Sequence, residues 1–536
     1  MESTYSYSDR YRAYLNPIYA DLDASVIQQI EQILAQTNWE NPQTSLDWNN
    51  LGVIALIEAQ QVEDLTLRSV YIEMALDALT KATDLHDHPL PLIHLVILNQ
   101  LISSDNDEYL EGIFSYFIGF LDHAFRFKNA TNTGLIYLPL KDISLKKRNQ
   151  WQVINILVES DAYNQTFKLA CEILCQIHLI FYNSFGLRLL NLAIQLLPDS
   201  AITHLKLGIS NLSHNRQEGL FNLHRAHTIA PSLAVTQQAL YLAYRDMGHL
   251  DLAQVWLNSQ APLGCDPEDN QSWRWTELAI DSPMTYVPFD ESLLMAVEPS
   301  FQSIVTRVLI AEGDWFEQEM EFWRYWLKPG MTVIDVGANA GIYTFSAAKR
   351  VGATGRVFAI EPFSQCIQYL KVTKQLNQLD WVTICQGAAS DRRGTIRLSL
   401  ASASELNKVV VDGDSQADQI GPFEEVSCFR LDDLIDQENL AQVDWLKIDA
   451  EGHEMQVLQG SDRLLEKFMP GILYENIEGQ KSANIPVAEY LQAKGYKLFR
   501  YKPFLRRLIP IDTNHDLSNI LNVIALPNET INALLL

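Results

Sequence analysis

Apolar residues follow two different patterns along this chain of 536 residues. Over residues 1–300 they recur at steps of three and four, which predicts amphipathic helices joined by short turns. After about residue 301, apolar runs of strand length alternate with helical runs, and Gly and Asp stand at the junctions. Such alternation is typical of a wound α/β sheet. We therefore expect an all-α part followed by an α/β part.

The helical part contains a weak internal repeat. Helical runs close at Pro198 and at Pro231, so the period lies in the low thirties, as in a solenoid of helix pairs. An earlier unit carries an aromatic residue and small residues spaced for close helix packing: Trp48, Leu51, Gly52, Ala75, Ala78 and Ala82. These units resemble degenerate tetratricopeptide (TPR) repeats. Such arrays bind partners on a concave face, and the alternative is a scaffold that only stabilises or dimerises the other domain.

The boundary between the two parts follows from the loss of helical period. We predict an all-α TPR-like domain over residues 1–285 and an α/β domain over residues 306–536. Residues 286–305 contain prolines and no clear helical period, so we interpret them as a connecting segment. Nearby aromatic residues, among them Trp275 and Tyr286, indicate that this connection is packed rather than flexible.

Composition narrows the classes of function. The formal net charge of −26 disfavours binding to nucleic-acid phosphates or to anionic membrane surfaces. No apolar run of about 18 residues and no N-terminal targeting pattern is present, so we expect neither a membrane span nor export. The six cysteines are scattered, and Cys171 and Cys175 share a helical face without further metal ligands. We interpret them as reduced thiols of a cytoplasmic protein.

The α/β part opens with the pattern of a nucleotide site. Residues 332–336 predict a buried strand, Gly337 and Gly341 a tight turn, and residues 342–350 a helix. A helix N-terminus after a glycine turn offers outward-pointing N–H groups to a ligand. The next predicted strand, 356–360, ends at Glu361, and a carboxylate at this position can accept hydrogen bonds from ribose hydroxyls.

The glycine pattern separates two competing cofactor classes. Dinucleotide folds favour G-x-G-x-x-G, whereas this chain has Asn339 in place of the second glycine. Asp335 stands two residues before the first glycine. An acid at this place suits a cofactor that has an ammonium group and no pyrophosphate. The pattern therefore disfavours a nicotinamide dinucleotide.

Five motifs in this order resemble the FkbM-type methyltransferases. They are Asp335–Gly341, Glu361–Pro362, Ala388–Asp391, Leu431–Asp433 and Lys447–Glu454. The resemblance covers roughly residues 310–527, with one departure at Ala450, where the family more often has Val. It implies a class I, Rossmann-like methyltransferase sheet with S-adenosylmethionine as cofactor. It also implies O-methylation, often of sugar or polyketide hydroxyls, and it leaves the acceptor open.

The resemblance also implies roles for single residues at the cofactor site. Asp335, Gly337, Asn339 and Gly341 would hold the methionine end of S-adenosylmethionine, and Glu361 would hold its ribose. The segment after the third strand would lie against the adenine through two residues, Ala388 and Asp391. Asp391 can instead cap the turn 391–394.

Ionisable residues follow the predicted strand 443–448, at the edge where a wound sheet binds ligands. Asp449 is the first candidate for contact with the acceptor or cofactor. His453 is a candidate general base because its ordinary pKa lies near neutrality, although Glu451 and Glu454 can also cap the helix that follows. Lys447 can pair with an acid or contact the substrate. We expect these catalytic candidates to gather at one edge: Lys447, Asp449, Glu451 and His453.

Glu475 ends the next predicted strand and can join this group. Together with Asp449 and Glu451 it would offer the hard oxygen ligands that Mg²⁺ takes. Nothing in the spacing requires a metal, and we expect none.

These features predict an S-adenosylmethionine-dependent O-methyltransferase. Its acceptor would be a hydroxyl of a sugar, a glycan or a secondary metabolite, and the helical repeats would recruit the substrate or a protein partner. Two alternatives stay open. One is a repeat-protein adaptor with an inactive cofactor-binding domain, and the other is an NAD-dependent oxidoreductase.

Overall fold

The structure is a computed structural model that describes most of the chain. The described residues are 6–102, 132–138, 153–154, 156–177, 187, 190–191, 193–195, 198–259, 271–401, 404–410, 422–478, 482–511, 517 and 520–528. They form two compact units, one of residues 1–229 with 504–507 and one of residues 230–503 with 508–536. The functional domain limits expected from the sequence, with a connection at 286–305, stay a prediction.

The first unit is helical, as the apolar pattern predicts. Its helices are α1 (Tyr7–Leu15), η1 (Asn16–Asp21), α2 (Ala24–Gln36), α3 (Ser45–Gln61), α4 (Leu65–Asp84), α5 (Leu90–Ile102), α8 (Ala162–Ile177), α10 (Ala201–Asn211) and α11 (Arg216–Ile229). The caps follow from the sequence: Thr44 accepts the N–H of Asp47 at the start of α3, and Asp64 accepts the N–H of Leu67 at the start of α4.

The pair α3–α4 shows why small residues stand where a repeat would need them. A Cβ at Gly52 would lie 2.7 Å from Cγ of Leu79, so only glycine lets the two helices approach this closely. Ala75 and Ala82 are fully buried on the facing helix. Helix pairs α3–α4 and α10–α11 therefore exist, while their assignment to TPR repeats stays a prediction.

The second unit begins with two helices and a hairpin. Helices α12 (Ala234–Asp246) and α13 (Leu250–Leu257) precede η3 (Arg274–Glu277) and the antiparallel strands β1 (Thr285–Phe289) and β2 (Leu293–Val297). The sequence pattern did not predict this hairpin, which lies largely within the expected connecting segment. The expectation of a packed segment is confirmed there, since all five residues of β2 are buried.

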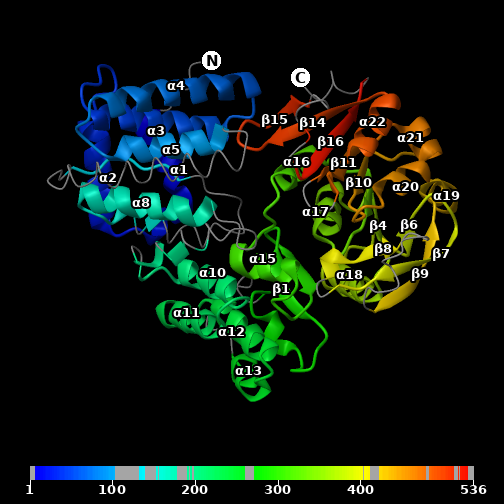
Figure 1. Cartoon of the computed structure of the whole chain (residues 1–536). Coiled ribbons are helices and arrows are strands. Elements are labelled where there is room, and N and C mark those ends of the chain that lie inside the picture. Colours follow the sequence, from blue (N-terminus) through cyan, green and yellow to red (C-terminus); the bar gives the residue numbers. More distant parts are fainter. Residues whose placement is uncertain are drawn as a thin grey trace. The chain divides into compact units, whose positions relative to one another are not determined.

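An eight-stranded sheet forms the centre of the second unit (Figure 1). Its order is β15-β14-β16-β11-β10-β3-β4-β5, and β16 runs antiparallel to its neighbours β11 and β14. The strands are β3 (Thr332–Val336), β4 (Arg356–Glu361), β5 (Val382–Gln386), β10 (Trp445–Ile448), β11 (Gly471–Glu475), β14 (Tyr496–Lys502), β15 (Arg507–Pro510) and β16 (Asn522–Pro527). The predicted wound sheet is confirmed.

The order of the strands tells where a ligand binds. The chain runs from β3 outward through β4 to β5, and then returns to the other side of β3 as β10 and β11. A crevice opens at the carboxyl ends of the strands where the winding direction changes, here between β3 and β10. The intervening helices are α15 (Ile304–Glu312), α16 (Glu319–Trp326), α17 (Ile342–Val351), α18 (Ser364–Leu376), α19 (Leu431–Gln437), α20 (Glu454–Gln459), α21 (Asp462–Phe468) and α22 (Ile485–Ala493).

A second, smaller sheet between β5 and β10 was not predicted. Its order is β6-β9-β7-β8, with β6 (Ala388–Ala389), β7 (Gly394–Ser399), β8 (Lys408–Val410) and β9 (Phe423–Phe429). Its core consists of five buried hydrophobic residues among those described, so its strands lack a long apolar signal. A separate pair, β12 (Ile477–Glu478) with β13 (Ser482–Ala483), follows β11.

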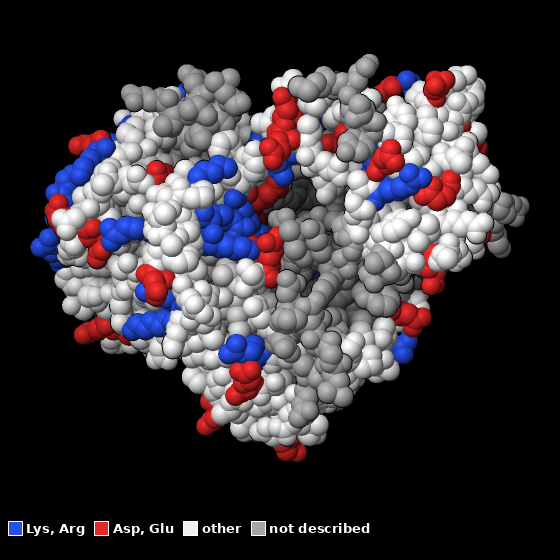
Figure 2. Space-filling model, turned by 180° about the vertical axis from the view of Figure 1, so that it is seen from behind, with Lys and Arg blue, Asp and Glu red and all other residues white. Residues whose placement is uncertain are grey.

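Charged side chains of both signs lie on the surface of the protein. On the face drawn in Figure 2, basic and acidic side chains are interspersed, and acidic side chains border the largest basic group. Among the described helices, none is both long and apolar enough to cross a bilayer. Cys366, Cys385 and Cys428 are free thiols, while the side chains of Cys171, Cys175 and Cys265 lie outside the described residues.

Candidate functional site

The glycine turn after β3 has the backbone that its sequence requires. Gly337, Asn339 and Gly341 all have positive φ, at 73°, 49° and 97°. A Cβ at Gly337 would lie 1.7 Å from the carbonyl oxygen of Asp449, so the end of β10 approaches this turn directly. Glycine is needed at this position both for its φ and for the close approach.

Asp335 lies at the carboxyl end of β3 and is fully buried. Its Oδ2 accepts a hydrogen bond of 2.6 Å from the hydroxyl of Thr344, in α17. Its Oδ1 lies 3.8 Å from Nζ of Lys447 and has no hydrogen-bond partner among the described residues. Burial raises the pKa of Asp335, and Lys447 opposes this rise. A buried carboxylate oxygen without a donor fits the ammonium group of a cofactor.

Glu361 lies at the tip of the neighbouring strand β4 and is only 5% exposed. Its Oε2 accepts the N–H of Asn339 at 2.8 Å, and its Oε1 accepts the N–H of Phe363 at 2.8 Å. Burial raises the pKa of Glu361 to about 7, against the effect of these two N–H groups. Each oxygen keeps a second lone pair, which can accept a ribose hydroxyl.

The side chain of Asn339 stabilises the turn itself. Its Oδ1 accepts the N–H of Ala340 at 2.6 Å, and its Nδ2 lies 3.4 Å from the hydroxyl of Ser404. Asn tolerates the left-handed region better than most residues because its short side chain bonds locally. Its direct contact with a cofactor stays a prediction.

The residues expected beside the adenine lie at the start of the small sheet. Ala388 belongs to β6, is buried and pairs with Cys428 of β9. Its neighbour Gly387 donates its N–H to the carbonyl of Glu361 at 2.9 Å, which joins this segment to the tip of β4. Asp391 is exposed and accepts a hydrogen bond of 3.2 Å from the hydroxyl of Ser390. Contact of either residue with the adenine stays a prediction.

Lys447 joins the acids of β3 and β10. The two strands are parallel with Lys447 opposite Asp335, so its side chain reaches both this acid and Asp449, at 3.0 Å. The ammonium also lies over the ring of Tyr343, 4.8 Å from its centroid. Although burial disfavours the charge, Asp449 and Asp335 raise the pKa of Lys447. Lys447 therefore stays charged and partly neutralises an acidic site.

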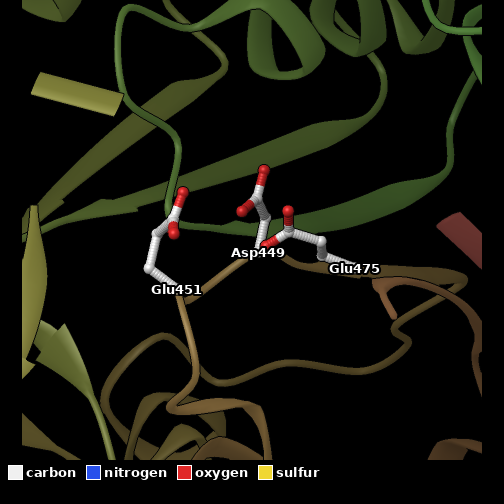
Figure 3. Close-up of side chains that lie close together, drawn as sticks. All are labelled: Asp449, Glu451 and Glu475. Atoms are coloured by element: carbon white, nitrogen blue, oxygen red, sulfur yellow. The ribbon is translucent and has the colours of Figure 1, made fainter. Parts of the chain in front are cut away.

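Three carboxylates gather beyond the strand ends (Figure 3). One oxygen each from Asp449, Glu451 and Glu475 lies within 4.8 Å of the other two. Burial together with the neighbouring Asp449 raises the pKa of Glu451 to about 7 and that of Glu475 to about 10. At neutral pH Glu475 therefore carries a proton, and Glu451 is near its midpoint.

The expected catalytic group is divided by the structure. Lys447, Asp449 and Glu451 lie together with Glu475, but His453 makes its described hydrogen bond to the hydroxyl of Ser390, at 3.0 Å. Burial lowers the pKa of His453. A general-base role for His453 stays a prediction that its contacts do not favour.

The N–H groups that Glu454 accepts precede α20, so its interpretation as a cap of that helix stays a prediction. Its Oε1 accepts the N–H groups of Ala450 and Gly452, each at 3.0 Å, and its Oε2 lies 3.2 Å from Nδ2 of Asn484. Helix α20 begins at Glu454. Gly452 has a φ of 93°, which is incompatible with a right-handed helix.

One acid near the site was missed by the sequence analysis. Glu317 precedes α16, which begins at Glu319. Asp314 pairs with Arg324 at 2.6 Å and holds the preceding segment beside the helix. Glu317 accepts a hydrogen bond from the hydroxyl of Tyr343 at 2.5 Å and another from Nδ2 of Asn522 at 3.0 Å. No local motif marks it, because its partners come from distant segments.

Comparison with known proteins finds a family match over part of the second unit. Residues 335–498 match the family described as Methyltransferase FkbM domain. The "Methyltransferase sdnD" of Sordaria araneosa is 26% identical over 194 residues, which is 31% of this chain and 74% of that protein. The family match covers the turn after β3, the tip of β4 and the ends of β10 and β11.

Two solved structures are similar to this chain over less than half its length. Methyltransferase FkbM from Methylobacillus flagellatus KT is 14% identical with a TM-score of 0.25, and the match covers 42% of this chain and 53% of that chain, about half its length. TYW2 of M. jannaschii in complex with AdoMet is 15% identical with a TM-score of 0.25, covering 46% of this chain and 86% of that chain. Residues 335–498 are therefore similar to the Methyltransferase FkbM domain, and this match supports S-adenosylmethionine as the cofactor.

Proposed function

We propose that the α/β domain transfers a methyl group from S-adenosylmethionine to a hydroxyl of a sugar, a glycan or a secondary metabolite. One observation carries the proposal. Two buried carboxylates, Asp335 and Glu361, end neighbouring parallel strands, and the Oδ1 of Asp335 has no donor among the described residues. The acids of β10 and β11 lie on the opposite side of β3. An acceptor bound beside these acids would therefore lie next to the cofactor.

Each residue has a proposed task at the cofactor end. Asp335 accepts the ammonium group through its free oxygen, while Thr344 and Lys447 hold the carboxylate in place. Glu361 accepts the ribose hydroxyls and keeps the turn at Asn339 fixed through its backbone. Ala388 and Asp391 flank the adenine. The glycines Gly337 and Gly341 keep the turn free of side chains where the cofactor approaches.

At the acceptor end, the residues align an oxygen and take its proton. When bound, S-adenosylmethionine supplies an electrophilic methyl group on a positively charged sulfur. Glu451, with its pKa near 7, accepts the proton of the acceptor hydroxyl. Protonated Glu475 donates a hydrogen bond to that acceptor, and Asp449 with Lys447 sets its orientation. Alignment of this kind removes translational freedom and can lower the barrier by several kcal/mol.

The three carboxylates also match the ligand type of Mg²⁺. We propose that no metal is needed, because a proton on Glu475 and the charge of Lys447 already relieve their repulsion. A chelator such as EDTA should then leave turnover unchanged after extensive dialysis. Loss of turnover that added Mg²⁺ restores would instead establish a metal-assisted reaction.

We propose that the helical unit recruits the substrate or a protein partner, since its helices contribute none of the site residues named above. The function as a whole is tested by calorimetry with S-adenosylmethionine, S-adenosylhomocysteine and NAD, followed by methyl transfer to a panel of hydroxyl compounds. Binding of both sulfur nucleosides without NAD, and a methylated oxygen in the product, is the expected result. Binding without transfer to any acceptor would favour the adaptor, and binding of NAD alone would favour the oxidoreductase.

A further inference from the structure

One extended segment crosses the interior of the helical unit. Residues 132–138 form neither helix nor strand, yet the side chains of Leu135, Ile136, Tyr137 and Leu138 are at most 1% exposed. Buried backbone N–H and C=O groups need partners, which a helix or a sheet ordinarily supplies. This segment has neither, so its partners must come from elsewhere.

Amide side chains supply the hydrogen-bond partners of the backbone at Gly134 and Leu135. Gln165, in α8, accepts the N–H of Gly134 at 3.1 Å and donates to its carbonyl at 3.2 Å. At Leu135, Oδ1 of Asn50 accepts the N–H and Nδ2 of Asn49 donates to the carbonyl, each at 3.0 Å. Side-chain amides of α3 and α8 thus do what a neighbouring strand would do.

Two tyrosines and a histidine continue this pattern. The hydroxyl of Tyr11 bonds both the N–H of Ile136, at 3.2 Å, and its carbonyl, at 3.1 Å. The hydroxyl of Tyr14 does the same for Leu138, at 3.0 Å to each group.

Between them, the N–H of Tyr137 donates to Nε2 of His94 at 3.0 Å. Burial lowers the pKa of His94 to about 3, so the ring is neutral. Its Nδ1 then carries the proton and donates to Oδ1 of Asn49 at 2.7 Å. Each residue from Gly134 to Leu138 thus has a backbone hydrogen bond to a side chain.

This arrangement binds the backbone of the segment directly. Four elements, α1, α3, α5 and α8, turn buried polar groups toward one chain segment, and each group is costly to bury unless it is paired. Bonding to N–H and C=O along an extended chain is how proteins bind peptides. We propose that the helical unit is a binding site for an extended polypeptide, occupied here by residues 132–138, and that a matching segment of another protein replaces them.

The side chains of the site define the partner. A Cβ at Gly134 would lie 2.8 Å from Cδ2 of Leu46 and 2.9 Å from Cδ2 of Leu90, so glycine fits this position best and a larger residue requires these side chains to move. The next four positions are apolar and enclosed. The hydroxyl of Tyr137 is buried without a partner among the described residues, so phenylalanine fits this place better. The partner is therefore an extended segment with glycine followed by four apolar residues, the third of them aromatic.

The first test uses the wild-type full-length chain and a synthetic peptide with the sequence of residues 132–138. Hydrogen exchange is followed at the amides of Leu135 to Leu138 and, as a reference, at the amides of α4. Saturating peptide should speed exchange in the segment at least several-fold and leave α4 unchanged. Exchange in the segment that is unaffected by millimolar peptide would overturn the proposal, because the segment would then be a permanent part of the core.

The second test removes the resident segment by substitution. Gly134→Val should expel it and raise the affinity of the unaltered peptide at least tenfold over wild type, because competition within the chain is lost. Asn132→Val is the matched control, since its side chain is exposed and only its carbonyl is contacted, by His88. A peptide with the same Gly-to-Val change should not bind, and one with phenylalanine for Tyr137 should bind about tenfold more tightly.

Folding of the variant is checked by circular dichroism. If Gly134→Val loses helical signal, the unaltered peptide should restore it in a saturable way. Failure to restore the signal, or equal affinity of the variant and the wild type for the peptide, would contradict the proposal.

Discussion

At the scale of single residues, burial and charge explain the properties of the site. Four acids have raised pKa values because they are enclosed: Asp335, Glu361, Glu451 and Glu475. The positively charged side chain of Lys447 lies among the acids of β3 and of the end of β10. An excess of negative charge in a low-dielectric site attracts the sulfonium cation of S-adenosylmethionine. After methyl transfer the sulfur is neutral, so the site binds the product less strongly than the cofactor and releases it more readily.

Asp335→Asn should weaken S-adenosylmethionine binding by about 2 kcal/mol, because a hydrogen bond to a charged group is lost. Glu361→Gln should have an effect of similar size, since one carbonyl oxygen cannot serve two N–H groups and two hydroxyls. Calorimetry measures both. Asp444→Asn is the control, because Asp444 accepts the N–H of Thr332 at the opposite end of the same sheet. If neither substitution at the site changed the affinity, the cofactor would bind elsewhere.

Glu451 should control the pH dependence of the reaction. Its pKa is about 7 in the free protein, so the fraction of Glu451 that is unprotonated increases as pH rises. The value of kcat/KM for S-adenosylmethionine should therefore increase through pH 7. Glu451→Gln should lower turnover by about 10² to 10⁴ and abolish this limb. Glu425→Gln, at an exposed position of β9, serves as the control. An unchanged pH profile in Glu451→Gln would assign the proton transfer to another group.

At the scale of elements, the turn after β3 and the end of β10 depend on each other. Gly337 has a φ of 73°, and a Cβ added there would lie 1.7 Å from the carbonyl oxygen of Asp449, so only glycine leaves room for that carbonyl. The parallel register of β3 and β10 brings Lys447 to Asp335. The two strand ends therefore form one unit, in which a change in the turn also moves the acids of β10.

Gly337→Ala should abolish measurable cofactor binding and lower the Tm, since the added carbon cannot fit against Asp449. Gly248→Ala isolates the cost of the backbone conformation alone, because Gly248 has a similar φ of 77° and open space around its Cβ position. That control should lose about 1 kcal/mol of stability and keep cofactor affinity. Thermal unfolding with and without S-adenosylhomocysteine separates the two effects. Equal behaviour of both variants would show that the close approach does not matter.

At the scale of the whole molecule, the enclosed acids link stability to pH. Their folded pKa values lie above the unfolded values, so the folded state binds more protons than the unfolded state over the intervening range. The stability from these groups is complete below about pH 4.5 and declines as pH rises through 7 toward 10. S-adenosylmethionine should offset part of this decline, because it binds only the folded state.

Glu475→Gln should therefore raise the Tm of the ligand-free protein at pH 8–9 and change it little at pH 5. Each kcal/mol gained corresponds to about 2–4 °C for a domain of this size. Differential scanning calorimetry at a series of pH values measures the difference. Exposed Glu425→Gln should leave the slope with pH unchanged. A wild-type stability that rises from pH 6 to pH 9 would contradict the sign argued here.

Local sequence was sufficient for the centre of the fold and the cofactor end of the site. The strand 332–336, the turn at Gly337 and Gly341, and the acid at Glu361 all follow from short-range patterns, because each needs only neighbouring residues to specify it. The same holds for helix pairs such as α3–α4. Glycines, caps and apolar periods act within a few residues along the chain.

Only the tertiary structure decided which acids share a site and which segments fill the interior. Glu317 and Glu475 come to the strand ends from distant parts of the sequence, and His453 lies against Ser390. The backbone of residues 134–138 obtains its hydrogen bonds from side chains of four separate helices. These pairings depend on strand order and on side chains meeting across long sequence separations. The pattern of residues along the sequence does not specify these long-range contacts, because the free energy that stabilises them comes from burial in the folded state.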